Sequence, residues 1–227
     1  IIGFLNILQK EMYGNLNEKQ KEFLAITLLN SSVLKKLINN LLDLSIIHSG
    51  QVSLEKESFI INDVIQNIIH ESLPIIEKKN NFIMVDLQDQ NMSVFADKQK
   101  FFQLVQNLIF NANKYTNEGT IQCIVSQTSS FVNIVIKDDG NGLTKDQKYT
   151  LFQAFKTETS SEFSFDESIG IELAIVKELV RLHDGEIHLE SELDQGTSYT
   201  IIFPQDNDLN DISNESKDEL HYDYSLV

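Results

Sequence analysis

Apolar side chains recur every three or four residues through the first 50 positions, which indicates helices. From Glu18 to His48 the chain has no Gly or Pro, so one long helix is expected there. A shorter helical pattern at 1–11 precedes it across a polar turn at 12–17. The long helix carries a mostly apolar, coiled-coil-like seam at Phe23, Ile26, Asn30, Val33, Leu37, Leu41 and Leu44. A hairpin cannot cover this seam alone, so we expect residues 1–48 to form a homodimer through a four-helix bundle.

Beyond residue 50 the pattern changes to short strands that alternate with amphipathic helices. Strands are predicted at 52–61, 82–87, 93–96, 120–126, 131–137, 186–190 and 197–203. Helices are predicted at 62–79, 97–116 and 169–182. From residue 206 the chain is acidic and polar, which predicts a disordered tail. We therefore expect an α+β protein with a helical hairpin over 1–50, a second domain over 51–205 and a tail over 206–227.

The helix predicted at 97–116 carries polar groups that suit a phosphate and a cation. Asp97 precedes its apolar stripe and is a candidate N-cap. Asn107 and Asn111 lie four positions apart, so their side chains share one helix face, and Lys114 follows on the same side. Amide oxygens and water suit Mg²⁺, whereas a lysine ammonium suits the phosphate charge. On its own, the same pattern also fits two solvated asparagines.

A second stretch supports a ligand-binding role for this helix. The strand predicted at 131–137 ends in Asp138-Asp139-Gly140-Asn141-Gly142. The helix with Asn111, followed by a strand ending in D-x-G-x-G, resembles the N box and the first glycine box of the ATP-binding domain of sensor histidine kinases. The resemblance covers nearly the whole chain. It implies a Bergerat-type sandwich with a mixed sheet and helices on one face, and it implies ATP and Mg²⁺ as ligands.

The resemblance also implies a role for each matched residue. Asp138 would accept a hydrogen bond from the adenine amino group, and Gly140 and Gly142 would let the backbone approach the base. Asn111 would be a ligand of Mg²⁺. The remaining matched positions, expected near the phosphates or beside the nucleotide, are Asn107, Lys114, Tyr115, Gly170 and Thr197. For Tyr115, packing in the core is favoured over stacking on the base.

One matched segment departs from the family pattern. Residues 151–155 resemble the F box, and 157–168 resemble a lid over ATP. The glycine-rich box that precedes Leu173, G-x-G-x-G in the family, is here Ser168-Ile169-Gly170-Ile171-Glu172, in which only the middle glycine remains. A carboxylate at Glu172, about 4 Å from a phosphate, would cost on the order of 4 kcal/mol at an effective dielectric near 20. We therefore expect the chain to bind ATP weakly or not at all.

The hairpin resembles the dimerisation and phosphotransfer hairpin of the same family. By this resemblance the phosphoacceptor histidine lies upstream of residue 1, and none of the five histidines present matches its position. The implied function is transfer of the ATP γ-phosphate to that histidine and then to a response-regulator receiver domain. The alternative is a pseudokinase or phosphotransfer-like scaffold that binds a response regulator without ATP, which Ser168 and Glu172 favour. The hairpin disfavours a chaperone or topoisomerase ATPase of the same fold.

Composition and charge limit the partners and the cellular location that we expect. The net charge of −16, from 18 basic and 34 acidic residues, argues against a nucleic-acid partner. One cysteine, Cys123, excludes an intrachain disulfide and fits a reducing cytosol, where we expect it to be a small core residue. No apolar run reaches the roughly 20 residues of a membrane span, so no membrane contact is expected from this segment. We expect a cytoplasmic location, as for the cytoplasmic part of a longer, membrane-anchored protein.

Overall fold

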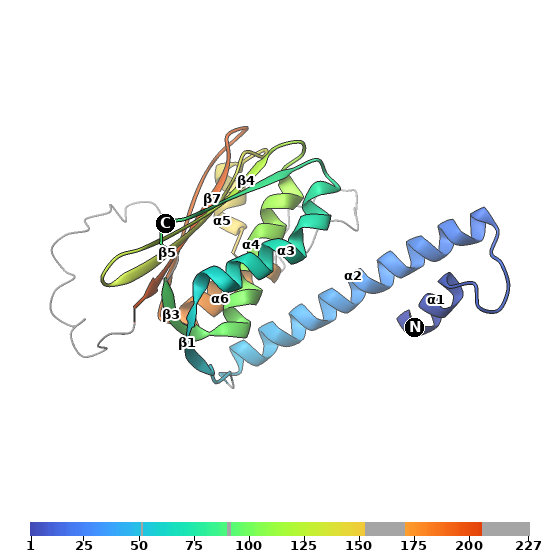
Figure 1. Cartoon of the computed structure of the whole chain (residues 1–227), viewed down its shortest axis with the longest axis horizontal. Coiled ribbons are helices and arrows are strands. Elements are labelled where there is room, and N and C mark those ends of the chain that lie inside the picture. Colours follow the sequence, from blue (N-terminus) through green and yellow to red (C-terminus); the bar gives the residue numbers. More distant parts are fainter. Residues whose placement is uncertain (51, 90–91, 153–170, 206–227) are drawn as a thin grey trace. The chain divides into compact units, whose positions relative to one another are not determined.

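The computed structural model describes residues 1–50, 52–89, 92–152 and 171–205 (Figure 1). Its chain forms two compact units. The first unit contains residues 1–53 together with 146–178, and the second contains 54–145 together with the chain from residue 179 onward. The predicted segments 157–168 and 206–227, and most of 151–155, lie outside the described residues.

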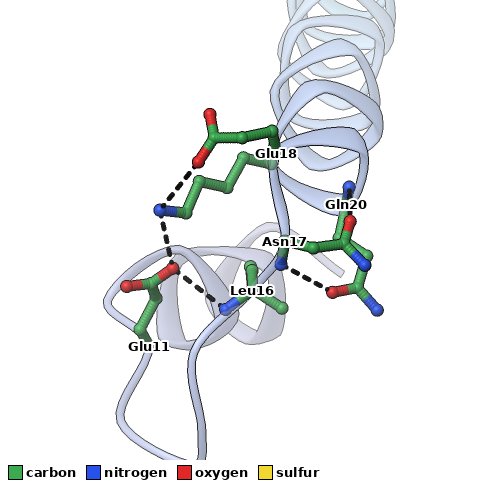
Figure 2. Close-up of polar contacts among 6 residues, drawn as sticks. Glu11, Leu16, Asn17, Glu18 and Gln20 are labelled. Carbon is green, nitrogen blue, oxygen red and sulfur yellow. Dashed lines mark hydrogen bonds and ion pairs between the residues drawn. The ribbon is translucent and has the colours of Figure 1, made fainter.

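Two helices, α1 (Ile2–Gln9) and α2 (Glu18–His48), form the predicted hairpin in the first unit (Figure 1). Their connection is fixed by polar contacts, which Figure 2 shows. Asn17 caps α2 in a capping box. Its side chain accepts from the Gln20 backbone amide, and the Gln20 side chain accepts from the Asn17 backbone amide, both at 2.9 Å. Glu11 accepts from the Leu16 amide at 3.0 Å and lies 3.1 Å from the Lys21 ammonium. The polar turn predicted at 12–17 is therefore held at both of its ends.

The second unit contains a mixed five-stranded sheet in the order β2-β4-β5-β7-β6. Its strands are β2 (Phe82–Leu87), β4 (Thr120–Gln127), β5 (Phe131–Asp138), β6 (Glu186–Glu192) and β7 (Gly196–Pro204). Strand β2 runs parallel to β4, and the remaining pairs are antiparallel. A separate antiparallel pair consists of β1 (Lys56–Ile60) and β3 (Ser93–Asp97).

Helices α3 (Ile61–Glu77) and α4 (Lys98–Tyr115) lie side by side over one face of this sheet (Figure 1). Buried residues alternate along the central strands, so that one face of the sheet packs into the core. The predicted stripe of α4, which is Phe101, Leu104, Val105, Leu108 and Ile109, is completely buried. Burial of these aliphatic and aromatic groups is the main force that fixes α4 against the sheet.

The α+β class with a mixed sheet is confirmed, and so are the predicted helices and strands that lie in the described residues. Helix α6 (Ile171–Leu182) follows the prediction from its first described residue. A short helix, α5 (Lys145–Thr150), lacks an apolar stripe and was not predicted. Cys123 is buried, as expected, and burial raises the pKa of its thiol to about 12, so the reactive thiolate is strongly disfavoured.

Candidate functional site

Helix α4 presents the polar residues that the sequence singled out. Asp97 is its N-cap, as predicted, and the carboxylate accepts from the amides of Gln99 at 3.1 Å and Lys100 at 3.0 Å. Asn107 and Asn111 are half-buried on the helix face that is not packed into the core. The folded helix therefore brings the two amides to one face, as their spacing predicts.

The side chain of Asn111 has a defined orientation. Its Nδ2 donates to the hydroxyl of Tyr199 on β7 at 2.8 Å. Tyr199 is itself buried, which raises the pKa of its hydroxyl, so the hydroxyl stays protonated. Because the amide nitrogen is engaged, the carbonyl oxygen Oδ1 points to the other side and makes no hydrogen bond to any described residue. That oxygen is suited to a hard cation.

Two further residues at the C-terminal end of α4 were predicted beside the nucleotide. The Lys114 ammonium lies 5.2 Å from the centre of the Tyr115 ring, a cation–π contact. Tyr115 is 43% exposed, so the prediction that it packs in the core is wrong. Ala112, Asn113 and Thr116 are buried, so the Tyr115 ring lies on the exposed side of the helix end, which the apolar stripe ending at Ile109 could not indicate. An exposed ring paired with a lysine is available for contact with a ligand.

Asp138 ends β5 as a buried carboxylate with an unusual hydrogen-bond pattern. Its Oδ1 accepts from the amides of Gly140 at 3.0 Å and Thr197 at 3.3 Å. Its Oδ2 accepts no hydrogen bond from the described residues. Burial raises the pKa of this carboxyl, and two backbone amides only partly compensate. An oxygen without a donor, on a carboxylate that is otherwise buried, is a ready acceptor for a ligand N–H group.

Thr197 contributes to this site through its backbone rather than its side chain. The Thr197 hydroxyl lies 3.1 Å from the Ser191 hydroxyl, and Ser191 donates to the Gly196 carbonyl at 2.8 Å. These bonds hold the turn between β6 and β7, so that the Thr197 amide faces Asp138. Ser191 could not be identified from the sequence, because its hydrogen-bond partners are brought to it by the pairing of β6 with β7.

The glycines of this region are required by the protein's own backbone. A Cβ on Gly140 would overlap the carbonyl oxygen of Tyr115, and one on Gly142 would overlap that of Glu192. Gly142 also has a φ of +63°, a conformation that favours glycine. The tight packing between the end of β5, α4 and the β6–β7 turn explains these two glycines without any bound base.

The end of α4 is held by two residues that the sequence did not single out. Asn81 donates to the Asn113 side chain at 2.8 Å and to the Thr116 carbonyl at 2.9 Å. The Lys79 ammonium lies among the last carbonyl oxygens of the same helix. Both residues lie more than 30 positions before their partners, and neither belongs to a motif, so the spacing could not identify them.

The phosphate side of the predicted site is described only in part. Ser168 and Gly170 lie outside the described residues. Glu172 lies in the first turn of α6, and its carboxylate is 2.8 Å from the Lys36 ammonium of α2, in the first unit. The cost estimated from the sequence for Glu172 beside a phosphate did not include this neighbouring positive charge. Lys36 is distant in sequence, so the ion pair could not be foreseen.

No group of three or more His, Cys, Asp or Glu side chains within the described residues could hold a metal ion. The available cation ligand is the single oxygen of Asn111. Mg²⁺ keeps several waters and is commonly shared with substrate phosphates, so one amide oxygen fits an ion that arrives with a nucleotide.

Within the described part of the chain, every helix is too short or too polar to span a bilayer.

Comparison with known proteins identifies the family. Residues 96–207 match the histidine kinase-, DNA gyrase B- and HSP90-like ATPase family. The chain is 35% identical over 192 residues to the circadian input-output histidine kinase CikA of Synechocystis sp., an alignment that covers 83% of this chain and 26% of CikA. The chain carries the ATP-binding core of a sensor histidine kinase. This kinase core spans about a quarter of the length of the curated relatives that it matches.

Two solved histidine kinases share the fold of the kinase core. Full-length ShkA in complex with AMPPNP has a TM-score of 0.74 at 21% identity, with 89% of this chain and 42% of that chain covered. ThkA in complex with the response regulator protein TrrA has a TM-score of 0.65 at 22% identity, with 90% of this chain and 56% of that chain covered. At these identities the likeness shows the fold.

Proposed function

We propose that the chain binds Mg²⁺-ATP between the end of β5 and α4, and that it serves as the kinase core of a two-component sensor. In this proposal the γ-phosphate passes to a histidine of the longer protein, upstream of residue 1, and then to a response-regulator receiver domain. The coarser part, an ATPase domain of the histidine kinase type, rests on the family match over 96–207.

The observation that carries the proposal is the buried Asp138 carboxylate. One oxygen is occupied by two backbone amides and the other is without a donor, at the end of a strand beside α4. An exocyclic amino group of a base would supply the missing donor and would offset part of the burial cost of the charge. The complex of ShkA with AMPPNP supports a nucleotide in this fold.

The phosphate end of the nucleotide would lie toward α4. The oxygen Oδ1 of Asn111 would be a ligand of Mg²⁺, and Asn107 and Lys114 would lie near the phosphates. When bound, Mg²⁺ would neutralise phosphate charge and polarise the transferred group. The Tyr199 hydroxyl keeps the Asn111 amide in the orientation that this role requires.

The alternative is a scaffold that binds a response regulator without ATP, and it rested on Ser168 and Glu172. The ion pair between Glu172 and Lys36 weakens that alternative, because a compensated carboxylate repels phosphate much less than an isolated one. The complex of ThkA with TrrA supports a response regulator as partner under either function.

Calorimetry with Mg²⁺-ATP tests the proposal through Asp138→Asn. We expect the substitution to weaken binding by about 1–3 kcal/mol, since the new amide can present a donor toward the adenine amino group. Asp139→Asn removes the same charge one position away, where the carboxylate accepts from the Thr120 amide, and we expect it to retain binding.

The melting temperature of the Asp138→Asn variant distinguishes a loss of nucleotide binding from a loss of folding. The raised pKa means that the charged Asp138 opposes folding once the pH exceeds its folded pKa, so Asn at this position should leave the melting temperature of the free protein unchanged or higher at pH 7. If the original chain does not bind Mg²⁺-ATP, the kinase proposal fails. If Asp138→Asn binds as tightly as the original, the base is recognised elsewhere.

A further inference from the structure

The Lys79 ammonium occupies a cage of main-chain oxygens. It donates to the carbonyls of Lys114 at 2.6 Å, Asn113 at 3.0 Å and Thr116 at 3.5 Å. Two of these carbonyls belong to the last turn of α4, and the third belongs to its C-cap. Among the described residues, no carboxylate pairs with Lys79. The ammonium is therefore bound by the end of one helix.

The chemistry of a helix end explains why a cation lies there. The last four carbonyls of a helix have no partner inside the helix, and they carry the negative end of its dipole. An ammonium has three donors and a full positive charge, so it can satisfy several of these oxygens at once. The Ala112 carbonyl is already occupied by the amide and hydroxyl of Thr116, at 3.1 Å and 2.8 Å.

Asn81 holds the same helix end through further hydrogen bonds, and it also binds the residue just before the next strand. Its Nδ2 donates to the Asn113 side chain and the Thr116 carbonyl, and its Oδ1 accepts from the Gly119 amide at 3.0 Å. The Glu118 amide also donates to the Lys79 carbonyl at 3.3 Å. The turn that follows α3 therefore clasps the segment in which α4 ends and β4 begins. The position of the last turn of α4 depends on this clasp.

We infer that Lys79 is a positioning residue for the phosphate side of the nucleotide site, acting through the last turn of α4. This inference rests on the proposed binding of Mg²⁺-ATP. Asn111 and Lys114 are the residues proposed to face Mg²⁺ and the phosphates, and they lie on or next to the turn that Lys79 holds. The oxygens of Asp138 receive no contact from Lys79 or Asn81. Within the described residues, Asp138 is linked to the last turn of α4 only through Gly140, which packs against the Tyr115 carbonyl, so recognition of the base depends less directly on the clasp.

A change at Lys79 should therefore weaken binding of the phosphates more than binding of the base. Misplacement of binding groups by about 1 Å can cost large factors in function. With Lys79→Ala we expect the affinity for Mg²⁺-ATP to fall about tenfold more than the affinity for adenosine, which lacks phosphates. Lys78→Ala is the matched control, because Lys78 is the exposed neighbour and makes no contact with α4. We expect it to leave both affinities unchanged.

Chemical rescue gives a readout that general destabilisation would not produce. A small alkylammonium ion can enter the space left by Lys79→Ala and donate to the same carbonyls. We expect ethylammonium chloride to restore Mg²⁺-ATP affinity, and tetramethylammonium chloride at equal concentration to have no effect, because it has no N–H donor. If both salts act alike, or neither restores affinity, Lys79 does not act through the carbonyl cage.

If the alanine variant does not fold, Lys79→Gln is the second test variant, because its side chain retains an N–H donor but has no charge. We expect it to weaken Mg²⁺-ATP several-fold relative to adenosine, and an unchanged ratio of the two affinities would overturn the inference. Failure of the original chain to bind Mg²⁺-ATP would instead overturn the proposed function. Binding by the original chain with equal losses for both ligands in the variants would overturn only the role of Lys79.

Discussion

Glu172 shows how the meaning of a single residue depends on a distant partner. At a helix N-terminus the dipole favours a negative charge, and the nearby Lys36 ammonium adds a second source of positive potential. The Glu172 side chain is only 16% exposed, whereas Lys36 is 51% exposed. The carboxylate is therefore a structural contact between α6 and α2 within one compact unit. Its acidity does not by itself argue against a nucleotide.

A double-mutant cycle measures this ion pair. We expect Lys36→Met and Glu172→Gln to show a favourable coupling of about 0.2–1 kcal/mol in urea unfolding, the range of partly exposed pairs. The coupling should fall at high salt because exposed charges are screened. Lys35→Met in place of Lys36→Met is the control and should give no coupling with Glu172. A cycle that gives zero for both lysines would mean that the pair contributes no stability.

At the scale of elements, α4 is fixed at both ends. Lys79 and Asn81 hold its C-terminal end, and Asp97 joins its N-terminal end to two other segments. The Asp97 carboxylate also accepts from the Glu55 amide at 3.1 Å, and the Asp97 amide donates to Nε2 of His183 at 3.1 Å. His183 follows α6, and its Nδ1 lies 2.7 Å from the Leu179 carbonyl. Since Nε2 accepts a hydrogen bond, Nδ1 carries the proton and the ring is neutral.

Acid should weaken this junction through His183. Burial lowers the pKa of the imidazole below its ordinary value of about 6.5, and the neighbouring charges are those of Lys56, Asp97 and Asp184. The unfolded chain therefore takes up a proton before the folded chain does. We expect the free energy of unfolding to fall as the pH drops below about 6.5, by at most about 1.4 kcal/mol per pH unit, until the folded pKa is reached.

Urea unfolding between pH 5 and 7.5 tests this dependence. Carboxyl groups also titrate near the lower limit, so the comparison uses variants. His183→Gln should reduce the slope between pH 6.5 and 5, and the control His70→Gln, at an exposed position outside this junction, should not change it. If the slope is the same in all three proteins, protonation of His183 does not control stability in this range.

At the scale of the whole molecule, the sequence predicts what is local and misses what joins distant segments. The stripe and N-cap of α4 depend on neighbours three or four positions apart, and D-x-G-x-G marks the end of β5 for the same reason. The partners of Lys79 and Glu172 are more than 30 positions away and depend on the tertiary fold. The exposure of Tyr115 likewise depends on which side of the end of α4 the tertiary fold covers. The polar face of α4 and the end of β5 could therefore be predicted from the sequence, whereas the contacts that support them could not.

The apolar seam of α2 leads to a prediction about assembly. In the single chain, Phe23, Ile26 and Leu41 are respectively 57%, 48% and 49% exposed, although they follow a coiled-coil-like spacing. Leu44 of the same seam is already buried within the single chain, so the expectation that it is uncovered is wrong. Burial of each such side chain against a second copy would contribute roughly 1.5–3 kcal/mol. We therefore expect the chain to form a homodimer through residues 1–48, as a four-helix bundle.

Light scattering with matched charge variants tests the dimer. Leu41→Glu places a charge in the seam, and we expect it to convert the dimer into a monomer at the same concentration, because an unpaired charge is costly to bury. Asn39→Glu adds the same charge at an exposed position outside the seam and should leave the dimer intact. The second unit should keep its fold in both variants, which binding of Mg²⁺-ATP would report. A monomeric original chain at high concentration would contradict dimerisation through this hairpin, and equal effects of the two variants would place the interface on another surface.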